Sequence, residues 1–326
     1  MKLLITGGLG FIGINLVKSL LKRKKTKKII IIDNMSKNSD DNLKSICEFT
    51  KSTSKYMPSK SRVHLVKVNI SNPKIALQVT KDVDYVVHLA AESGVDLSIK
   101  NPMQAFDTNV VGAFNYLEAS RINKVKGFIF ASSGAVFGDV KPPIRENDKR
   151  DPISPYGSSK LSIETYCETY SNIFKLGTTI LRFSNAYGPY SQHKNSVIHK
   201  FVRNILNNKS IRINGDGNHT RDFIYVDDIV SAIEVNLKKK NKHDSYNIST
   251  GKETSLKELV QFLTDVFTIE YNKKIKYNHG SERLGDILRN YSSNSKIKKC
   301  LSWKPKIKLK EGVRKTISWY VGEFTK

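Results

Sequence analysis

Short apolar runs alternate with longer amphipathic segments along the first half of the chain. The runs are rich in Val, Ile, Leu and Phe, and most have the length of one buried strand. They cover residues 3–6, 29–32, 63–68, 83–91, 127–134 and 178–183. Helical spacing of apolar residues is clearest at 14–21 and 102–121. The alternation predicts an α/β fold with a doubly wound parallel sheet, whose right-handed crossovers bring the carboxyl ends of the strands to one edge.

Other segments depart from this repeat. Residues 34–61 are polar with a weak helical pattern, so we expect a loop and one short helix there. Helices near 255–267 and 310–320 indicate a second, smaller domain. We expect the sheet domain to comprise residues 1–185 and 219–251, and the smaller domain residues 186–218 and 252–326.

Composition narrows the class of protein. A content of 39% hydrophobic and 26% charged residues is typical of a globular protein, and no apolar run approaches the roughly 20 residues of a membrane span, so we expect a cytoplasmic protein with no membrane partner. The net charge of +25 comes mostly from lysine. Without a zinc finger, an RNP-like motif or a basic tail, we interpret these lysines as solvated and expect no nucleic-acid partner. Cys47, Cys167 and Cys300 are scattered, which predicts neither disulfides nor a metal site.

Three glycines follow the first apolar run and begin its helix. Gly7, Gly10 and Gly13 permit a tight turn and the approach of a pyrophosphate, and the helix N-terminus attracts phosphate charge. The second run ends in Asp33, about 20 residues beyond the last glycine. Its carboxylate would accept a hydrogen bond from the adenosine ribose and repel a 2′-phosphate. We therefore expect a dinucleotide site that favours NAD over NADP.

Two further strand ends add candidates at the same edge. Asn69 and Ile70 follow the third run, where a loop could reach the adenine. Ala90 and Ala91 end the fourth run, and their small side chains would let a cofactor lie close to the backbone. His88 stands inside that apolar run, so we expect a packed, hydrogen-bonded histidine rather than a ligand.

A tyrosine and a lysine stand four residues apart just inside an expected helix start. Tyr156 and Lys160 would share one helical face, where the ammonium favours the phenolate of a group whose unperturbed pKa is about 10. The pair could thus form a general base, although this spacing also occurs by chance in solvated helices. Ser133 ends the fifth run, and ligands gather at the carboxyl ends of such strands.

Several motifs occur in order along nearly the whole chain. They are Gly7-x-x-Gly10-x-x-Gly13, Asp33, His88-Leu89-Ala90-Ala91, Asn101-Pro102, Asn109-Val110-x-Gly112, Ser132-Ser133, Val136-Phe137-Gly138 and Tyr156-x-x-x-Lys160. Together they resemble the extended short-chain dehydrogenase/reductase family of nucleotide-sugar epimerases and dehydratases. The resemblance implies a Rossmann domain that binds NAD and a substrate-binding cap domain. It adds these cofactor contacts to those above: Phe11, Ile12, Asn34, Leu89, Asn109, Tyr156 and Lys160.

The resemblance also implies a reaction. Tyr156 would take a sugar hydroxyl proton while hydride passes from the same carbon to NAD, Lys160 would lower the tyrosine pKa and bind the nicotinamide ribose, and Ser133 would hydrogen-bond the reacting oxygen. An epimerase returns the hydride to the other face of the 4-keto sugar. We therefore predict a nucleotide-sugar 4-epimerase acting on UDP-glucose and UDP-galactose, or on UDP-GlcNAc and UDP-GalNAc.

Substrate contacts are implied in the second half of the chain. The family counterparts of Asn185 and Arg221 contact the nucleotide diphosphate, and a guanidinium suits phosphate. Arg283-Leu284-Gly285-Asp286 is similar to a motif whose arginine holds phosphate and whose aspartate meets the nucleotide ribose. The counterpart of Asn290 gates the sugar pocket, and an asparagine there is compatible with N-acetyl sugars.

Departures from the family pattern separate the alternatives. Where 4,6-dehydratases carry Thr-Asp-Glu, this chain has Ser133-Gly134-Ala135 and lacks both carboxyl groups that eliminate water. A dehydratase, or a CDP-, GDP- or TDP-sugar epimerase, remains the alternative. Asn185 replaces the threonine of uronate epimerases, which disfavours an acidic sugar, and Phe137 replaces the usual tyrosine. An alternative of another class is a non-catalytic NAD-binding sensor.

The apolar stripe of residues 102–121 is broader than one core contact requires. The resemblance implies a homodimer in which this helix and the helix at 156–174 form a four-helix bundle with their copies in the partner.

Overall fold

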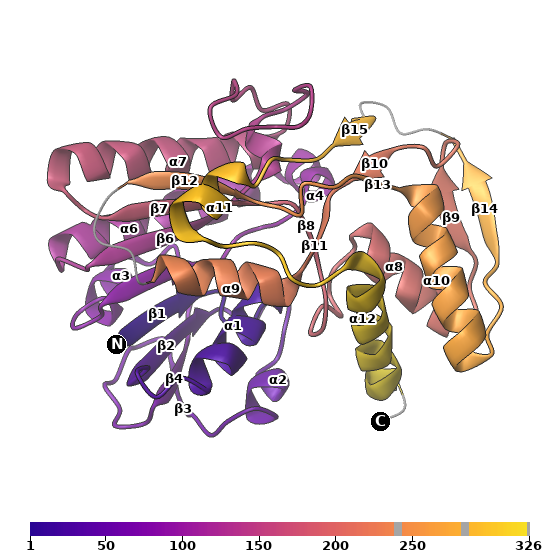
Figure 1. Cartoon of the computed structure of the whole chain (residues 1–326). Coiled ribbons are helices and arrows are strands. Elements are labelled where there is room, and N and C mark those ends of the chain that lie inside the picture. The colour runs from indigo at the N-terminus through magenta and orange to yellow at the C-terminus, as the bar shows by residue number, and fades with distance from the viewer. Residues whose placement is uncertain (238–242, 282–286, 325–326) are drawn as a thin grey trace. The chain divides into compact units, whose positions relative to one another are not determined.

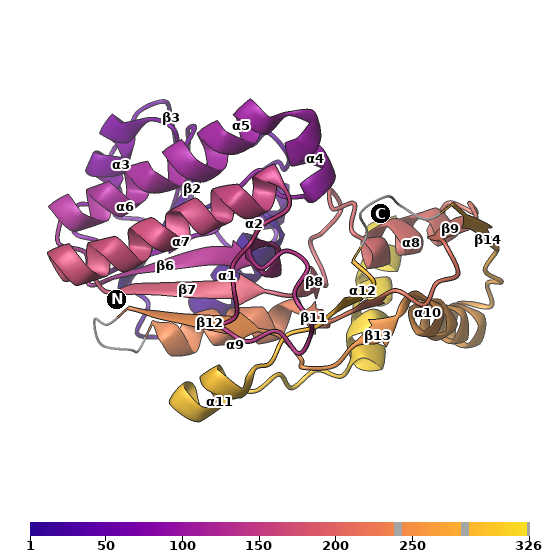
Figure 2. The ribbon, with the colours of Figure 1, turned by 90° about the horizontal axis from the view of Figure 1, so that it is seen from above.

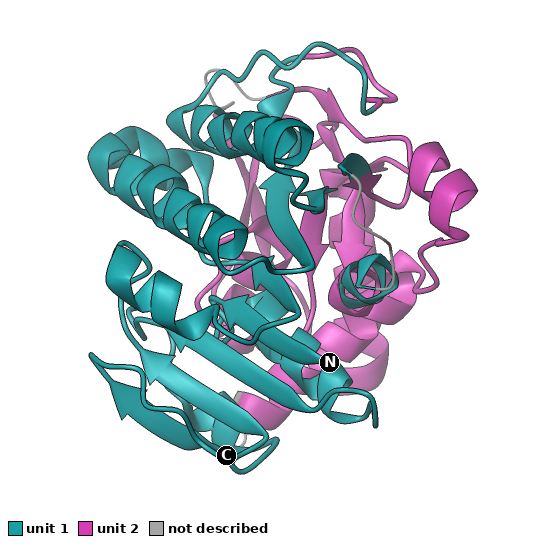
Figure 3. Cartoon of the chain, turned by 90° about the vertical axis from the view of Figure 1, so that its left-hand side faces the viewer, with its two compact units in different colours: residues 1–139, 146–183, 230–246 teal, residues 140–145, 184–229, 247–326 magenta. Residues whose placement is uncertain are grey.

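The computed structural model describes residues 1–237, 243–281 and 287–324 (Figure 1). The chain forms two compact units, coloured separately in Figure 3. Unit 1 comprises residues 1–139, 146–183 and 230–246, and unit 2 comprises residues 140–145, 184–229 and 247–326. Residues 219–229 and 247–251 belong to unit 2 in the structure, whereas the sequence analysis assigned them to the sheet domain.

An eight-stranded sheet forms the centre of unit 1. Its strands are β1 (Lys2–Thr6), β2 (Lys28–Asp33), β3 (Thr50–Thr53), β4 (Val63–Lys67), β5 (Tyr85–His88), β6 (Gly127–Ser133), β7 (Thr178–Phe183) and β12 (Asp244–Ile248), whose last two residues belong to unit 2. The strand order is β12-β7-β6-β5-β1-β2-β4-β3. Thr6 pairs in parallel with Ile32 on one side and with His88 on the other, so neighbouring strands end at the same edge. The predicted doubly wound sheet is confirmed.

Helices cover both faces of this sheet (Figure 2). The helices of unit 1 are α1 (Phe11–Leu21), α2 (Asp41–Lys44), α3 (Pro73–Val79), α4 (Val95–Lys100), α5 (Pro102–Phe106), α6 (Ala113–Ile122), α7 (Pro155–Phe174) and α9 (Val226–Asn236), which begins in unit 2. Helices α3, α6 and α7 pack on one face against alternate strand residues such as Leu4, Ile30 and Phe128. On the other face α1 and α9 are joined by Ser19 Oγ, which donates to Glu234. Because successive side chains of a strand point to opposite faces of the sheet, helices on both sides bury both faces.

Two local features differ from the expected pattern. The helix predicted over 102–121 is interrupted by a π-helical turn, η1 (Asp107–Gly112). Residues 50–53 form the edge strand β3 within the stretch predicted as loop and short helix. Only Ser52 of these four residues is buried, which leaves a polar sequence with no strand signal.

Unit 2 is built from short strands and three longer helices. Its strands are β8 (Asn185–Tyr187), β9 (Ile211–Asn214), β10 (Thr220–Arg221), β11 (Phe223–Tyr225), β13 (Thr254–Ser255), β14 (Tyr277–Gly280) and β15 (Arg289–Asn290). Its helices are α8 (Val197–Leu206), α10 (Leu256–Tyr271), α11 (Ser295–Leu301) and α12 (Leu309–Phe324). Helix α10 starts with a capping box of Ser255 and Glu258, which fixes its first turn. The helices predicted near 255–267 and 310–320 are confirmed.

Candidate functional site

The glycine loop lies between β1 and α1 at the carboxyl edge of the sheet. Gly7 has φ +66, and a Cβ there would lie 2.8 Å from the Ala90 backbone, so a larger residue would strain the turn and clash with the loop after β5. Its N–H donates to Ile32 O at 2.7 Å. Helix α1 begins at Phe11, and Gly10 provides no side-chain cap. The N–H groups of the first turn are therefore suited to donate hydrogen bonds to a phosphate ligand.

Asp33 ends β2 beside this loop. Its carboxylate accepts hydrogen bonds from Leu9 N at 3.1 Å and Met35 N at 2.9 Å. Burial raises the pKa of Asp33, and these two hydrogen bonds oppose the rise. The neighbouring Asn34 is exposed and accepts from Ser36 N. An anchored carboxylate next to a phosphate-binding turn is the arrangement that recognises the ribose of a dinucleotide.

The loops after β4 and β5 complete the predicted cofactor edge. Asn69 is exposed, whereas the Ile70 side chain is buried and packs toward Gly112, so a ligand would meet Ile70 through its backbone. Ala90 N donates to Thr6 Oγ1 at 3.2 Å. The remaining predicted cofactor residues occupy the same loops and the first turns of α1: Ile12, Gly13, Leu89 and Ala91.

Helix α7 carries the predicted tyrosine and lysine in its first two turns. Ser154 caps the helix by accepting from Gly157 N at 3.1 Å. A Cβ on Gly157 would lie 2.4 Å from Ala135 O, so glycine lets α7 approach the short turn η2 (Gly134–Val136) that follows Ser133. This close packing brings the Tyr156 hydroxyl into hydrogen-bond contact with Ser133.

Lys160 is buried behind the tyrosine. Its ammonium donates to Ala131 O at 2.9 Å and lies 5.9 Å from the centre of the Tyr156 ring. Burial raises the pKa of Tyr156, and the hydrogen bond to Ser133 opposes this rise. Burial is the largest influence on this pKa, and the lowering by Lys160 stays a prediction. The structure therefore brings Ser133, Tyr156 and Lys160 together with the phenol favouring its neutral form.

His88 is a packed residue, as predicted. It is fully buried and stacks with the rings of Phe128 and Phe130, and its Nδ1 hydrogen-bonds with Thr6 Oγ1 at 3.0 Å. Burial, with a smaller effect of Lys160, lowers the pKa of His88 to about 3. The ring stays neutral at physiological pH and supports the strand rather than moving protons.

Asn109 connects the loop after β5 to helix α7. It lies in the π-helical turn η1, is almost fully buried, and its Oδ1 accepts from Glu92 N at 2.8 Å. Its Nδ2 donates to Glu92 O at 3.1 Å and to Ser159 Oγ at 3.0 Å. The Asn109 side chain thus holds the loop after β5 against α7, and its predicted contact with the cofactor stays a prediction.

Two serines that the sequence did not single out belong to the same neighbourhood. Ser98 Oγ accepts from Tyr156 N at 3.0 Å, and Ser159 also donates to Tyr156 O at 2.8 Å. The position of Ser159, one turn from the tyrosine, was the only signal for it. No motif or spacing in the sequence indicates that Ser98 contacts Tyr156.

Apart from Ser133 in unit 1, the predicted substrate residues that the structure describes lie in unit 2. Arg221 on β10 pairs in register with Asn290 on β15, and Asn185 N donates to Asp222 O at 2.9 Å, so the three positions adjoin within this unit. Arg221 Nη1 donates to Ile287 O at 2.7 Å. The predicted Arg283 and Asp286 lie outside the described residues.

A buried carboxyl group supports these substrate positions. Asp222 accepts from Thr250 N at 2.9 Å, Thr250 Oγ1 at 2.7 Å and Gly251 N at 3.0 Å. Burial raises the pKa of Asp222 to about 6 against these bonds. Asp222 thereby ties the β10 segment to the loop after β12.

Comparison with known proteins identifies the family. A family model described as GDP-mannose 4,6 dehydratase matches residues 4–316. The chain belongs to this family of extended short-chain dehydrogenases/reductases. A Methanocaldococcus jannaschii protein provisionally named UDP-glucose 4-epimerase is 36% identical over 97% of each chain. The fold described above is therefore that of a family of NAD-dependent nucleotide-sugar epimerases and dehydratases.

Solved structures of the family include both reactions. A UDP-glucose 4-epimerase from Thermotoga maritima, with UDP-glucose, has a TM-score of 0.88 and 31% identity, and the match covers 99% of this chain and 100% of that one. A dTDP-glucose 4,6-dehydratase from Streptomyces venezuelae, with NAD bound, also has a TM-score of 0.88, with 27% identity over 100% and 98% of the two chains. Overall similarity therefore does not separate epimerase from dehydratase.

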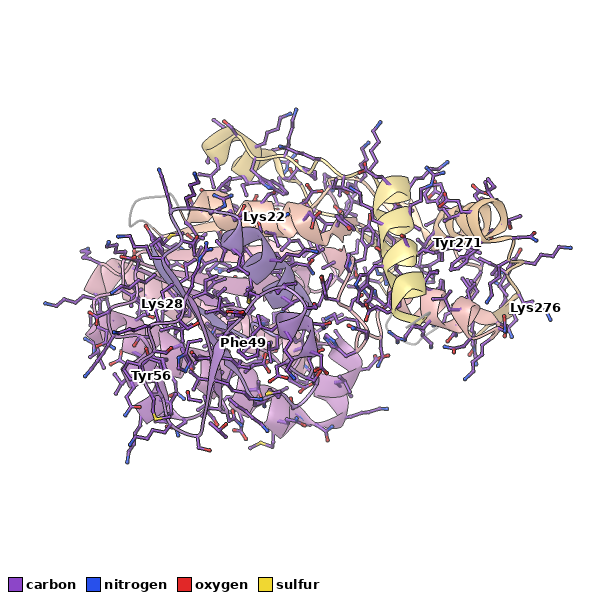
Figure 4. All side chains as sticks on the ribbon, turned by 90° about the horizontal axis from the view of Figure 1, so that it is seen from below. Lys22, Lys28, Phe49, Tyr56, Tyr271 and Lys276 are labelled. Carbon is purple, nitrogen blue, oxygen red and sulfur yellow. The ribbon has the colours of Figure 1, made fainter. Side chains whose placement is uncertain are left out.

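In the part of the chain that the structure covers, the remaining candidate features are metal clusters, membrane-spanning helices and one cavity, and none of them indicates a second functional site. Among the described residues, no group of three or more His, Cys, Asp or Glu could hold a metal ion. None of the helices that the structure describes is long and apolar enough to cross a membrane. A cavity of about 380 Å³ is lined by Lys2, Lys28 and Tyr56, among others, at the amino ends of β1 and β2; Figure 4 labels Lys28 and Tyr56. It lies at the edge of the sheet opposite the glycine loop, so it is not the cofactor site.

Proposed function

We propose that this protein is an NAD-dependent nucleotide-sugar 4-epimerase. The observation that carries the proposal is the cluster of Ser133, Tyr156 and Lys160 at the same sheet edge as the glycine loop and Asp33. The residues fit NAD: the glycine loop offers N–H groups to the pyrophosphate and Asp33 offers its carboxylate to the ribose. When bound, NAD would accept and return the hydride at C4 of the sugar.

The chain's own residues would move the proton and hold the sugar. Tyr156 would take the proton of the C4 hydroxyl and later give it back, while Ser133 hydrogen-bonds the same oxygen. Lys160 would hold the nicotinamide ribose and favour the phenolate. In unit 2, Asn185 and Arg221 would bind the diphosphate. Arg283 would also bind phosphate, and Asp286 would bind the nucleotide ribose.

A dehydratase reaction is the competing proposal, because relatives of both kinds match equally well. Dehydration across C5 and C6 requires an acid and a base beside the sugar. The two residues after Ser133 are Gly134 and Ala135, which form the turn η2 and carry no carboxyl group. This supports epimerisation, in which one base and a returned hydride are sufficient.

We propose UDP-sugars as substrates, namely UDP-glucose and UDP-galactose or their N-acetylamino counterparts. Asn290 supports the N-acetylated pair because its short amide leaves space at the position that gates the sugar pocket in the family. The test is incubation of the purified protein with UDP-glucose, UDP-GlcNAc, UDP-glucuronate, dTDP-glucose and GDP-mannose, with products identified by NMR. We expect 4-epimers without net consumption of NAD, whereas a stable 4-keto-6-deoxy sugar would refute the epimerase.

We also propose a homodimer. Helices α4 to α7 leave large apolar side chains in water, among which Met103, Phe106, Ile173 and Phe174 are each about half exposed or more. Apolar surface of this extent on adjacent helices is typical of an interface. A second copy of the same helices would cover it as a four-helix bundle.

A further inference from the structure

An ion pair joins the loops on either side of the glycine loop. Lys37 lies four residues beyond Asp33, the end of β2, and Glu92 lies four residues beyond His88, the end of β5. The Lys37 ammonium donates to Glu92 Oε1. Because β2 and β5 are the two neighbours of β1, their strand ends are about 10 Å apart, with the glycine loop between them. The pair therefore spans the turn that would hold the pyrophosphate.

Glu92 is the fixed member of this pair. Asn109 bonds both its backbone N–H and its carbonyl, and Gln104 Nε2 donates to its second carboxylate oxygen at 3.5 Å. The Glu92 side chain is only 12% exposed, whereas that of Lys37 is 39% exposed. A lysine on the more open loop can leave its partner without disturbing the fold, while the glutamate stays in place.

We propose that Lys37 and Glu92 form a clasp across the cofactor cradle that slows the release of bound NAD, an inference that rests on the proposed function. The Lys37 ammonium attracts the phosphates, and Glu92, which Asn109 and Gln104 hold in place, keeps that ammonium over the turn. The Glu92 carboxylate is mostly shielded from water, so salt screens this pair less than it screens a fully exposed pair. Retention suits an enzyme that returns the hydride to its own substrate, because the same NAD serves successive turnovers.

The test measures release of the dinucleotide rather than turnover. Protein loaded with NADH is mixed with excess NAD in a stopped-flow fluorimeter, and the loss of NADH fluorescence gives the dissociation rate. We expect Lys37→Met and Glu92→Gln each to raise this rate by roughly three- to tenfold. The double variant should release NADH no faster than the faster single variant, because both changes break one interaction.

Two further variants sharpen the test. Exchanging the charges, Lys37→Glu with Glu92→Lys, restores the pair and should bring the rate back toward that of the original protein. Lys126→Met is the matched control, since Lys126 pairs with Asp84 at the opposite edge of the sheet and its loss should leave the rate unchanged. High salt should raise the rate of the original protein more than that of the double variant.

The outcomes separate the clasp from the proposed function. If the original protein retains NADH but Glu92→Gln releases it at the same rate, Lys37 acts on the phosphates alone and the clasp is wrong, while the epimerase proposal stands. A charge-exchanged variant that releases NADH as fast as the single variants also refutes the clasp. A protein that binds no NADH at all overturns both proposals.

Discussion

At the scale of single residues, the Tyr156 hydroxyl is the group on which the proposed chemistry depends. Tyr156→Phe keeps the ring in its packing and removes only the proton-transferring oxygen. We expect kcat to fall by roughly 10²- to 10⁴-fold, the usual contribution of a positioned acid or base. NADH binding should persist, because Asp33 and the glycine loop are untouched. Unchanged biological output from this variant would instead favour the non-catalytic sensor.

Ser133 opposes the effect of burial on the pKa of that hydroxyl. Burial raises the pKa of Tyr156 and the Ser133 hydrogen bond lowers it, so Ser133→Ala should raise this pKa further. A base works in its deprotonated form, so activity rises with pH as the tyrosine ionises. The rising, acidic side of the pH profile should therefore move to higher pH in the variant. The measurement is kcat/KM between pH 6 and about pH 10. Thr165→Ala, on the exposed side of α7, is the control, and an unshifted profile in Ser133→Ala would contradict the assigned contact.

At the scale of elements, the π-helical turn η1 holds helix α7, which carries the proposed catalytic tyrosine. Asn109→Ala removes three hydrogen bonds and leaves the Glu92 backbone groups without this partner. We expect a loss of about 2–4 kcal/mol in the free energy of unfolding, measured with urea. Asn115→Ala on the adjoining helix removes one longer hydrogen bond and should cost about 1 kcal/mol or less. Equal losses in the two variants would argue against a special role for the turn.

The elements also show which structure the sequence could predict. Six buried strands were visible because burial on both faces requires continuous apolar runs. The edge strand β3 was not, since three of its four residues face solvent. The π-helical turn was hidden as well, because it is specified by the tertiary hydrogen bonds of Asn109 rather than by the spacing of apolar residues.

The candidate site follows the same division. Gly7, Asp33, Tyr156 and Lys160 could be predicted because each must stand at a fixed distance from a strand or helix end. Lys37, Glu92 and Ser98 could not, since their importance arises only when separate loops meet in space. Motif spacing thus predicts residues that one strand or helix end presents to a ligand. It does not predict residues that contact each other across separate loops.

At the scale of the whole molecule, the exposed apolar side chains of α5 and α7 favour a dimer. Met103 is 70% exposed and Ile173 65% exposed, and charging both by Met103→Glu and Ile173→Glu would bury repelling carboxylates in the proposed bundle. We expect the original protein to sediment as a dimer at micromolar concentration and the double variant as a folded monomer. Ile269→Glu on α10 is the control, because this equally exposed residue lies outside the stripe. A monomer before any substitution would exclude the bundle, and a dimer that survives both charges would place the interface elsewhere.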